Sequence, residues 1–252
     1  MNVDRERAVS QAFVGLANSL VDGADVVDLL SGLTASCARL LDVASAGLLL
    51  ADVRGVLHVV AASSERTRSL ELYQLQRDEG PCLDCFRGGT AVNVPDLSEA
   101  VVRWPQFVVA AVGAGFASVH ALPLRLRDNV LGALGLFGTD VGSLNDDDLS
   151  LGQALAHVAS VALVADKVAT EDRSGLDDQL RKALDTRVRV EQAKGLLAQQ
   201  GGIDMDRSFA ALRDYARHRG LRLGELAGML VSREMPAAEV LDHARDRRSA
   251  GL

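Results

Sequence analysis

The segment Arg187–Leu197 combines charged residues, an amide and a glycine on one expected helix. At about 100° per residue, Arg187, Glu191 and Lys194 share one helical face. The adjoining face is apolar and is formed by Val190, Ala193 and Leu197. A glycine inside a helix costs roughly 1 kcal/mol relative to alanine, so Gly195 indicates a close approach by a neighbouring helix or a ligand. One face can therefore pack while the other offers positive charge.

Cysteine is the second residue type whose spacing could carry chemistry. Cys82 and Cys85 form a CxxC pair directly after Pro81. A structural zinc site usually needs a second pair or histidines at matching spacing, and none is visible, so no metal site is predicted. A redox dithiol and local packing around Pro81 are both compatible with the pair, and packing is favoured. Cys37 follows a helical apolar pattern and is expected in a core.

The chain lacks the other residue sets that usually mark an enzyme. The sequence shows no serine–histidine–aspartate set, no phosphate-binding glycine loop and no paired catalytic carboxylates. We therefore predict no catalytic residue and a protein that is not an enzyme. No apolar run reaches the roughly 18 residues of a membrane span. The first twenty residues resemble no secretory signal, so a cytoplasmic protein without a membrane partner is expected.

Charge is distributed unevenly along the 252 residues, a length that favours two domains. Residues 1–175 hold 13 basic and 22 acidic side chains, a net charge of −9. Residues 176–252 hold 14 and 12, a net charge of +2. An acidic front joined to a mildly basic back fits a sensor joined to an anion-binding module, although two ordinary solvated surfaces would give the same pattern.

The elements expected to position these residues change type along the chain. The front part alternates helical patterns with β-prone runs, which predicts helices flanking a mainly antiparallel sheet in an α+β domain. Its expected helices are 8–21, 25–41, 65–76, 104–113 and 147–168, and its strands are 45–52, 56–63, 91–94, 118–127 and 130–137. A polar break, residues 169–175, reads as a short hinge. Beyond it, helices are expected at 176–200, 205–219, 223–234 and 237–247.

The front domain resembles a GAF domain of the actinobacterial type. The matching motifs are Asp78-Glu79-Gly80-Pro81-Cys82, Val92-Asn93-Val94-Pro95-Asp96-Leu97, Trp104-Pro105, His120-Ala121-Leu122-Pro123-Leu124 and Val130-Leu131-Gly132-Ala133-Leu134-Gly135-Leu136. They cover residues 8–168 in the right order. The resemblance implies a signal-sensing domain with a small-molecule ligand in its pocket, and it leaves the identity of that ligand and of any cofactor unknown.

The back of the chain is similar to an ANTAR domain, an all-α, three-helix RNA-binding module of transcription antiterminators. The match covers residues 176–235, and residues 236–252 follow as a partly helical tail. Its motifs are Ala183-Leu184, Arg187, Val190-Glu191-Gln192-Ala193-Lys194-Gly195-Leu196-Leu197, Phe209, Leu212-Arg213, Tyr215-Ala216-Arg217, Arg222-Leu223 and Glu225-Leu226-Ala227. Two positions depart from the family pattern, Ala198 and Ser208, and both changes are conservative.

These resemblances imply a signal-responsive regulator that binds paired RNA stem-loops in nascent mRNA and prevents transcription termination. Cations would hold phosphates, an amide would read an unpaired base and an aromatic ring would stack. The residues expected at the RNA interface are Arg187, Gln192, Ala193, Lys194, Gly195, Tyr215 and Arg217. Two stem-loops call for two modules, so a homodimer is expected through the long helices 8–21, 147–168 and 176–190. RNA polymerase would be an indirect partner.

Other interpretations of the same residues remain open. Arg187 and Lys194 could simply form surface ion pairs with Glu191, and Tyr215 could be a core residue. The C-terminal helices could instead act as a helix-turn-helix in a DNA-binding regulator. The least favoured alternative is a cysteine-dependent reductase of the GAF type that uses Cys82 and Cys85.

Overall fold

A computed structural model describes residues 3–21, 25–142, 144–165 and 174–249 of the chain. The contacts divide it into two compact units. The first, here called the N-terminal unit, comprises Met1–Gly23 and Leu29–Arg181, and the second, the C-terminal unit, comprises Ala24–Asp28 and Lys182–Leu252. The expected hinge at 169–175 lies outside the described residues except for its last two positions, which belong to a helix.

The N-terminal unit is built on an antiparallel sheet whose five strands have the order β2-β1-β5-β4-β3. The strands are β1 (Ser45–Ala51), β2 (Leu57–Ala62), β3 (Val92–Val94), β4 (Ser118–Leu126) and β5 (Asn129–Gly138). Two hairpins, β1–β2 and β4–β5, meet where β1 pairs with β5, as in the pair Gly47 and Gly135. β1, β4 and β5 are buried along most of their length, so helices must cover both faces of the sheet.

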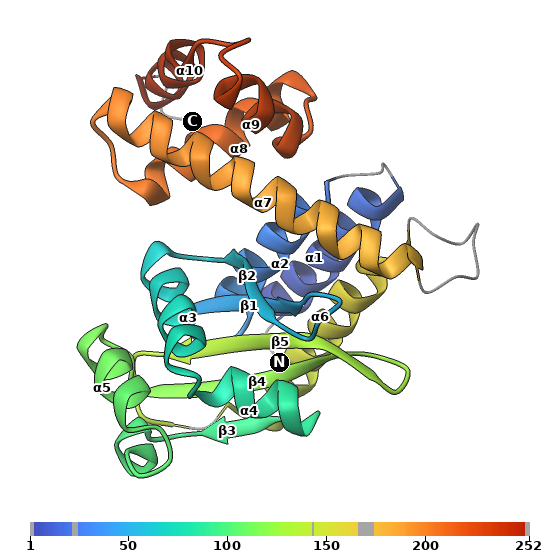
Figure 1. Cartoon of the computed structure of the whole chain (residues 1–252), viewed down its shortest axis with the longest axis vertical. Helices are drawn as coiled ribbons and strands as arrows, with labels where there is room; N and C mark the ends of the chain where they lie inside the picture. The colour runs from blue at the N-terminus through green and yellow to red at the C-terminus, as the bar shows by residue number, and fades with distance from the viewer. Residues whose placement is uncertain (1–2, 22–24, 143, 166–173, 250–252) are drawn as a thin grey trace. The chain divides into compact units, whose positions relative to one another are not determined.

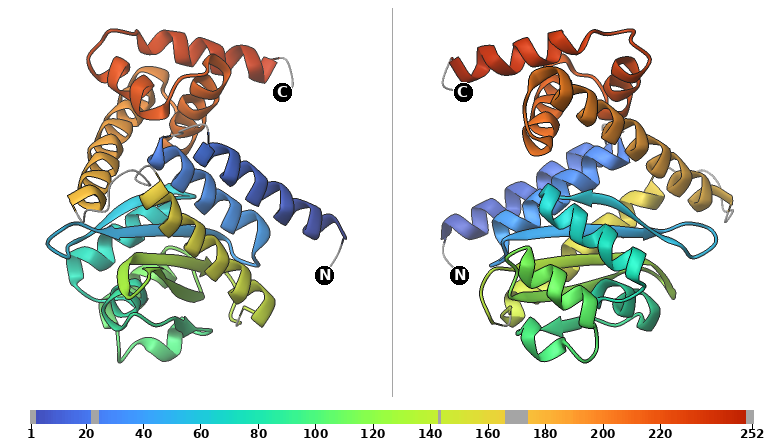
Figure 2. Two further views of the ribbon diagram at one scale, coloured as in Figure 1. Left: turned by 90° about the vertical axis from the view of Figure 1, so that its right-hand side faces the viewer. Right: turned by 60° about the vertical axis from the view of Figure 1, so that its left-hand side comes forward.

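Helices lie on both faces of this sheet (Figures 1 and 2). One side carries α1 (Val3–Val21), α2 (Val26–Leu40) and α6 (Asp146–Ala165). The other carries α3 (Glu65–Arg77), α4 (Pro81–Gly88), the 3₁₀ helix η1 (Leu97–Ala100) and α5 (Pro105–Gly113). Close contact with α6 is possible because Gly152 leaves room for Leu122 and Leu136 of the sheet. The α+β architecture expected from the sequence is therefore confirmed.

α4 is a helix that the sequence patterns did not predict. It is short, and its start is set by Gly80 at φ 144°, a conformation that strongly favours glycine, followed by Pro81 in the first turn. The preceding helix α3 ends at Arg77, and its C-cap residue Asp78 is left-handed at φ 56°. Asp78 and Gly80, both with positive φ, therefore separate α3 from α4, and α4 carries the buried Cys82 and Cys85.

The C-terminal unit is entirely helical. Its helices are α7 (Ser174–Gly201), which begins in the other unit, α8 (Met205–Arg219), α9 (Leu223–Val231) and α10 (Ala237–Ser249). Asp204 caps α8 through a hydrogen bond from the Arg207 N–H, and Gly220 ends it in the left-handed conformation. The core contains Val190, Ala193, Leu197, Leu212, Leu226, Leu230 and Val240, among other buried residues.

The segment expected as a C-terminal tail contributes to this core. Ala237, Val240 and Leu241 of α10 are buried in the same cluster as residues of α7, α8 and α9. The Tyr215 hydroxyl of α8 donates a hydrogen bond to the Glu239 carboxylate of α10 at 3.2 Å. α10 packs on this core because its apolar residues Ala237, Val240, Leu241 and Ala244 recur at helical spacing and share one face.

Candidate nucleic-acid interface

Arg187, Glu191 and Lys194 form an ion cluster on one face of α7. An Arg187 guanidinium nitrogen lies 2.5 Å from a Glu191 carboxylate oxygen, and the Lys194 ammonium lies 3.2 Å from both Glu191 oxygens. Their side chains are only 8%, 17% and 4% exposed, respectively. The spacing expected from the sequence is confirmed. In this structure the face is not the open, phosphate-facing edge that the sequence predicted. Glu191 pairs with both cations, and packing covers them.

Phe209 completes this cluster from α8. The Lys194 ammonium lies 5.5 Å from the centre of the Phe209 ring, and the Arg213 guanidinium lies 5.9 Å from it. Both distances are within the range of a cation–π interaction. Phe209 and Arg213 were not among the predicted interface residues. Their spacing of four residues on one helix places an aromatic ring and a cation on the same face, which is the sequence signal that could have found them.

Two other predicted interface residues lie in the core. Ala193 is fully buried among the apolar side chains of the C-terminal unit. Tyr215 is 2% exposed, packs edge-on against His243 at 5.4 Å and hydrogen-bonds Glu239. Its ring therefore cannot stack on an RNA base in this arrangement. The alternative interpretation of Tyr215 as a core residue fits the structure better.

The remaining predicted residues are accessible. Gln192 is exposed, and a Cβ atom added at Gly195 would meet nothing within 4 Å. Together with the exposed Val188 and Gln199 they form one stripe of α7, here called the open α7 face. Arg189 is exposed beside it. Gly195 thus leaves open space and is not needed for packing against the described part of the chain.

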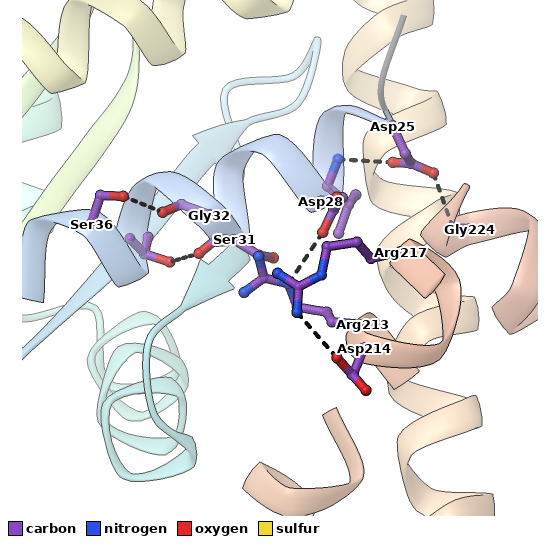
Figure 3. A network of polar contacts seen from close by, with 11 residues as sticks. Asp25, Asp28, Ser31, Gly32, Ser36, Arg213, Asp214, Arg217 and Gly224 are labelled. Carbon is purple, nitrogen blue, oxygen red and sulfur yellow. Dashed lines mark hydrogen bonds and ion pairs between the residues drawn. The ribbon is translucent and has the colours of Figure 1, made fainter. Parts of the chain in front are cut away.

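Arg217 and three aspartates belong to the polar contacts of the C-terminal unit (Figure 3). The Arg217 side chain is 79% exposed and donates to Asp214 at 3.1 Å, so it can reach a ligand by exchanging an exposed ion pair. Asp28 accepts a hydrogen bond from the Arg213 guanidinium at 3.2 Å. Asp25 accepts one from the backbone N–H of Gly224 at 3.2 Å.

Asp25 supplies the N-terminal capping hydrogen bond of α9, which no neighbouring side chain provides. Arg222 occupies the N-cap position and supplies no side-chain hydrogen bond. The Asp25 carboxylate satisfies the N–H of Gly224 in the first turn instead, and it also accepts from the Val27 N–H. Burial raises the pKa of Asp25, whereas these two backbone hydrogen bonds lower it. A residue remote in sequence therefore fixes the start of α9, which local capping rules could not predict.

Comparison with protein-family models identifies both units. A GAF domain model matches residues 23–164, which is more than half of the chain, and an ANTAR domain model matches residues 178–231. The chain belongs to the GAF-domain family and also carries an ANTAR domain. GAF domains are signal-sensing and ANTAR domains are RNA-binding antitermination modules, so both are regulatory domain types. The GAF and ANTAR resemblances stated from sequence motifs are confirmed, whereas the actinobacterial type stays a prediction.

Solved structures support the GAF fold. The GAF domain of an Acinetobacter phosphoenolpyruvate-protein phosphotransferase is 17% identical, with a TM-score of 0.51, over 68% of this chain and 100% of that one. The free methionine-R-sulfoxide reductase of Neisseria meningitidis, solved with its substrate, is 16% identical with a TM-score of 0.51. That match covers 66% of this chain and 92% of the reductase. At such identities the likeness concerns the fold alone.

Two further comparisons concern the chain as a whole. No curated protein matches the sequence. Among the described residues, no helix is both long and apolar enough to cross a lipid bilayer.

The cysteines of the GAF domain are enclosed in its interior. Cys82 donates a hydrogen bond to the Glu71 carboxyl at 3.6 Å, and Glu71 also accepts one from Gln74. Burial, assisted by the neighbouring Glu71, raises the pKa of Cys82 well above its usual value, and burial raises that of Cys85 to about 12. Both thiols are therefore protonated near neutral pH, which disfavours nucleophilic or redox chemistry.

Proposed function

We propose that the protein is a signal-responsive RNA-binding regulator that binds paired stem-loops in nascent mRNA and prevents transcription termination. The observation that carries the proposal is the open α7 face, which lies inside the matched ANTAR domain. RNA loops present unpaired bases, which are recognised by hydrogen bonds to their edges and by close backbone approach. An accessible amide beside an uncovered glycine supplies both.

Each accessible residue has a distinct role in this proposal. Gln192 reads a base edge through its amide, and Gly195 lets the RNA backbone approach the helix without meeting a Cβ atom. Arg189 and Arg217, both exposed, neutralise phosphates. Arg187 and Lys194 act as positioning residues, because their pairing with Glu191 fixes the face from which Gln192 projects.

The helices of the C-terminal unit argue against the DNA-binding alternative. A helix-turn-helix places its second helix in the major groove, where side chains on that helix must contact base edges and nearby phosphates. The corresponding helix, α9, contains no lysine or arginine, and Glu225 is its only charged residue. Four of its nine residues are the buried apolar side chains Leu223, Leu226, Ala227 and Leu230. α9 therefore suits a packed core better than a DNA groove.

The GAF domain supplies the signal in this proposal, and a homodimer supplies two RNA-binding modules. The long helices α1 and α6 carry exposed apolar residues, Val14 at 58% and Val161 at 38% exposure. Exposed valines on long helices suit a helix-packing interface with a second copy of the chain. RNA polymerase would be influenced indirectly, through the transcript, and the ligand of the GAF domain remains unassigned.

The experiment compares Gln192→Ala with Gln200→Ala, which removes another exposed amide about 80° further round the same helix. Binding of the full chain is measured by fluorescence anisotropy with a loop-bearing RNA and with a duplex DNA. We expect Gln192→Ala to weaken RNA binding by about tenfold, in line with the loss of one polar base contact. Gln200→Ala should bind RNA like the unmodified protein.

Preference for duplex DNA over the loop-bearing RNA would overturn the proposed function. Equal RNA affinities of both glutamine variants and the unmodified protein would instead remove the open α7 face as the contact surface. Circular dichroism of each variant checks that the helices are retained.

A further inference from the structure

The first turn of α2 is an acidic segment that belongs to the C-terminal unit. Residues Ala24–Asp28 fall in that unit, whereas the rest of α2, from Leu29 onward, falls in the N-terminal unit. The ANTAR model matches residues 178–231, so this turn is an addition to the matched RNA-binding module. One continuous helix is therefore shared between the GAF domain and the unit that carries the ANTAR domain.

Packing and polar contacts together dock this turn within the C-terminal unit. Val27 is fully buried in the apolar core of the unit. The Asp25 carboxylate accepts a hydrogen bond from the Gly224 N–H at 3.2 Å, and a Cβ atom added at Gly224 would collide with that carboxylate. The close fit holds the next residue, Asp28, at a defined place on the unit.

Asp28 places its carboxylate on a cation of α8 (Figure 3). The Arg213 Nε atom donates to Asp28 at 3.2 Å, and the side chains of Arg213 and Asp28 are 34% and 42% exposed. An ion pair that is this open to water is weak, so a stronger anion can displace the carboxylate. An RNA phosphate is such an anion, because the guanidinium fork matches its oxygens.

Arg213 lies beside a residue that already has a role in the proposed RNA contact. Arg217 follows it by four residues on α8, so the two side chains share one helical face. Arg217 is 79% exposed and was proposed above to neutralise a phosphate. Arg213 and Arg217 therefore form a basic stripe of α8, and Asp28 covers the Arg213 end of that stripe.

We propose that the first turn of α2 is an autoinhibitory contact, in which Asp28 competes with an RNA phosphate for Arg213. The inference rests on the proposed RNA-binding function and adds a means of regulation to it. RNA must displace Asp28 to gain Arg213, so the ion pair lowers the net affinity for RNA. Because α2 continues into the GAF domain, a signal that displaces this helix would release Arg213 and strengthen RNA binding.

Asp28→Asn tests the competition, and Asp242→Asn is its matched control. Asp242 lies in the same unit and pairs with Arg245 at 3.0 Å, so each variant removes one carboxylate that pairs with an arginine. Fluorescence anisotropy measures the affinity of the full chain for a loop-bearing RNA. We expect Asp28→Asn to bind about threefold more tightly than the unmodified protein, and Asp242→Asn to bind with nearly unchanged affinity.

Arg213→Ala shows whether the gain arises at the arginine. Combined with Asp28→Asn, it should abolish the gain and reduce the salt slope of RNA binding by about one, because a phosphate contact is lost. In the otherwise unmodified chain the same substitution should weaken RNA binding less, since it also removes the competing ion pair. Circular dichroism and urea unfolding of each variant check that the fold is retained.

Equal affinities of Asp28→Asn and Asp242→Asn would show that net charge alone matters, and would overturn the autoinhibitory contact. An unchanged or weaker affinity of Asp28→Asn, or a gain that survives Arg213→Ala, would overturn it as well. Failure of the proposed function itself gives a different result. In that case neither the unmodified chain nor any variant would prefer the loop-bearing RNA to duplex DNA, and both proposals would fall.

Discussion

Glu71 is a carboxyl group enclosed between α3 and the middle of the GAF sheet. Gly47 and Gly135, which pair across β1 and β5, leave the space that it occupies, because a Cβ atom at either position would lie about 2.5 Å from its carboxyl oxygen. Burial raises the pKa of Glu71 to about 8, although hydrogen bonds from Cys82 and Gln74 oppose the shift. Glu71 is therefore protonated at neutral pH.

This carboxyl makes stability depend on pH in a defined window. The folded-state pKa lies above the ordinary value of 4.5, so the stabilisation is fully present below pH 4.5 and is lost as the pH rises through about 8. Between pH 5 and pH 9 we expect the free energy of unfolding of the unmodified protein to fall by about 4 kcal/mol more than that of Glu71→Gln. Urea unfolding at both pH values measures the difference.

A surface variant serves as the control for this effect. Glu99→Gln removes an exposed carboxylate in η1 and should keep the pH dependence of the unmodified protein. Identical pH profiles for Glu71→Gln and the unmodified protein would show that Glu71 is ionised in the folded state.

Lys194 tests whether the buried ion cluster itself touches RNA. Its ammonium is held by Glu191 and lies near the Phe209 ring, so Lys194→Ala should lower the free energy of unfolding by about 1–2 kcal/mol. RNA affinity should fall, but its dependence on salt concentration should be unchanged, because no phosphate contact is lost. Arg189→Ala, at an exposed position, should instead reduce the salt slope by about one.

The opposite result would restore the expectation from the sequence. If Lys194→Ala reduces the salt slope of RNA binding as much as Arg189→Ala does, then the lysine leaves Glu191 and contacts a phosphate in the complex. Binding titrations between low and high salt distinguish the two cases.

At the scale of elements, two helical glycines offer a matched comparison. Added Cβ atoms at Gly195 in α7 and at Gly228 in α9 would both meet nothing within 4 Å. Gly195→Ala and Gly228→Ala should each raise the free energy of unfolding by about 0.5–1 kcal/mol, because alanine is the better helix former. Only Gly195→Ala should weaken RNA binding, since it alone places a methyl group on the open α7 face.

Denaturant unfolding and RNA titration of the two variants provide the measurement. Normal RNA affinity of Gly195→Ala would show that the RNA backbone does not approach α7 at this point. A loss of stability in Gly195→Ala would show that another part of the molecule occupies the open space.

At the scale of the whole molecule, self-association is the property to test. Val14 of α1 and Val161 of α6 are exposed on long helices, whereas Val53, which is 55% exposed, lies in the turn between β1 and β2. Sedimentation velocity should show a dimer for the unmodified chain and for Val53→Asp, and a shift toward monomer for Val161→Asp. A monomer under all conditions that still binds RNA tightly would remove the dimer from the proposal.

The sequence by itself determined the order and type of most elements. Helical and alternating patterns located both hairpins and nearly all helices, because burial of one face imposes a fixed period on local sequence. The motif around Gly195 identified the RNA-binding family before any geometry was known. The limits of α8 followed from Asp204 and Gly220, whose capping preferences are local. Such features depend on neighbours a few residues apart.

Only the tertiary structure decided which predicted interface residues are accessible. Pattern reasoning assigns the polar groups of Arg187, Lys194 and Tyr215 to a surface. All three residues are buried, and Glu191 and Glu239 pair with them. The Asp25 cap of α9 also depends on groups far apart in the chain. Whether a side chain is buried or paired depends on its neighbours in three dimensions. The spacing of residues along the chain could therefore suggest which residues contact RNA, but it could not show which of them are accessible.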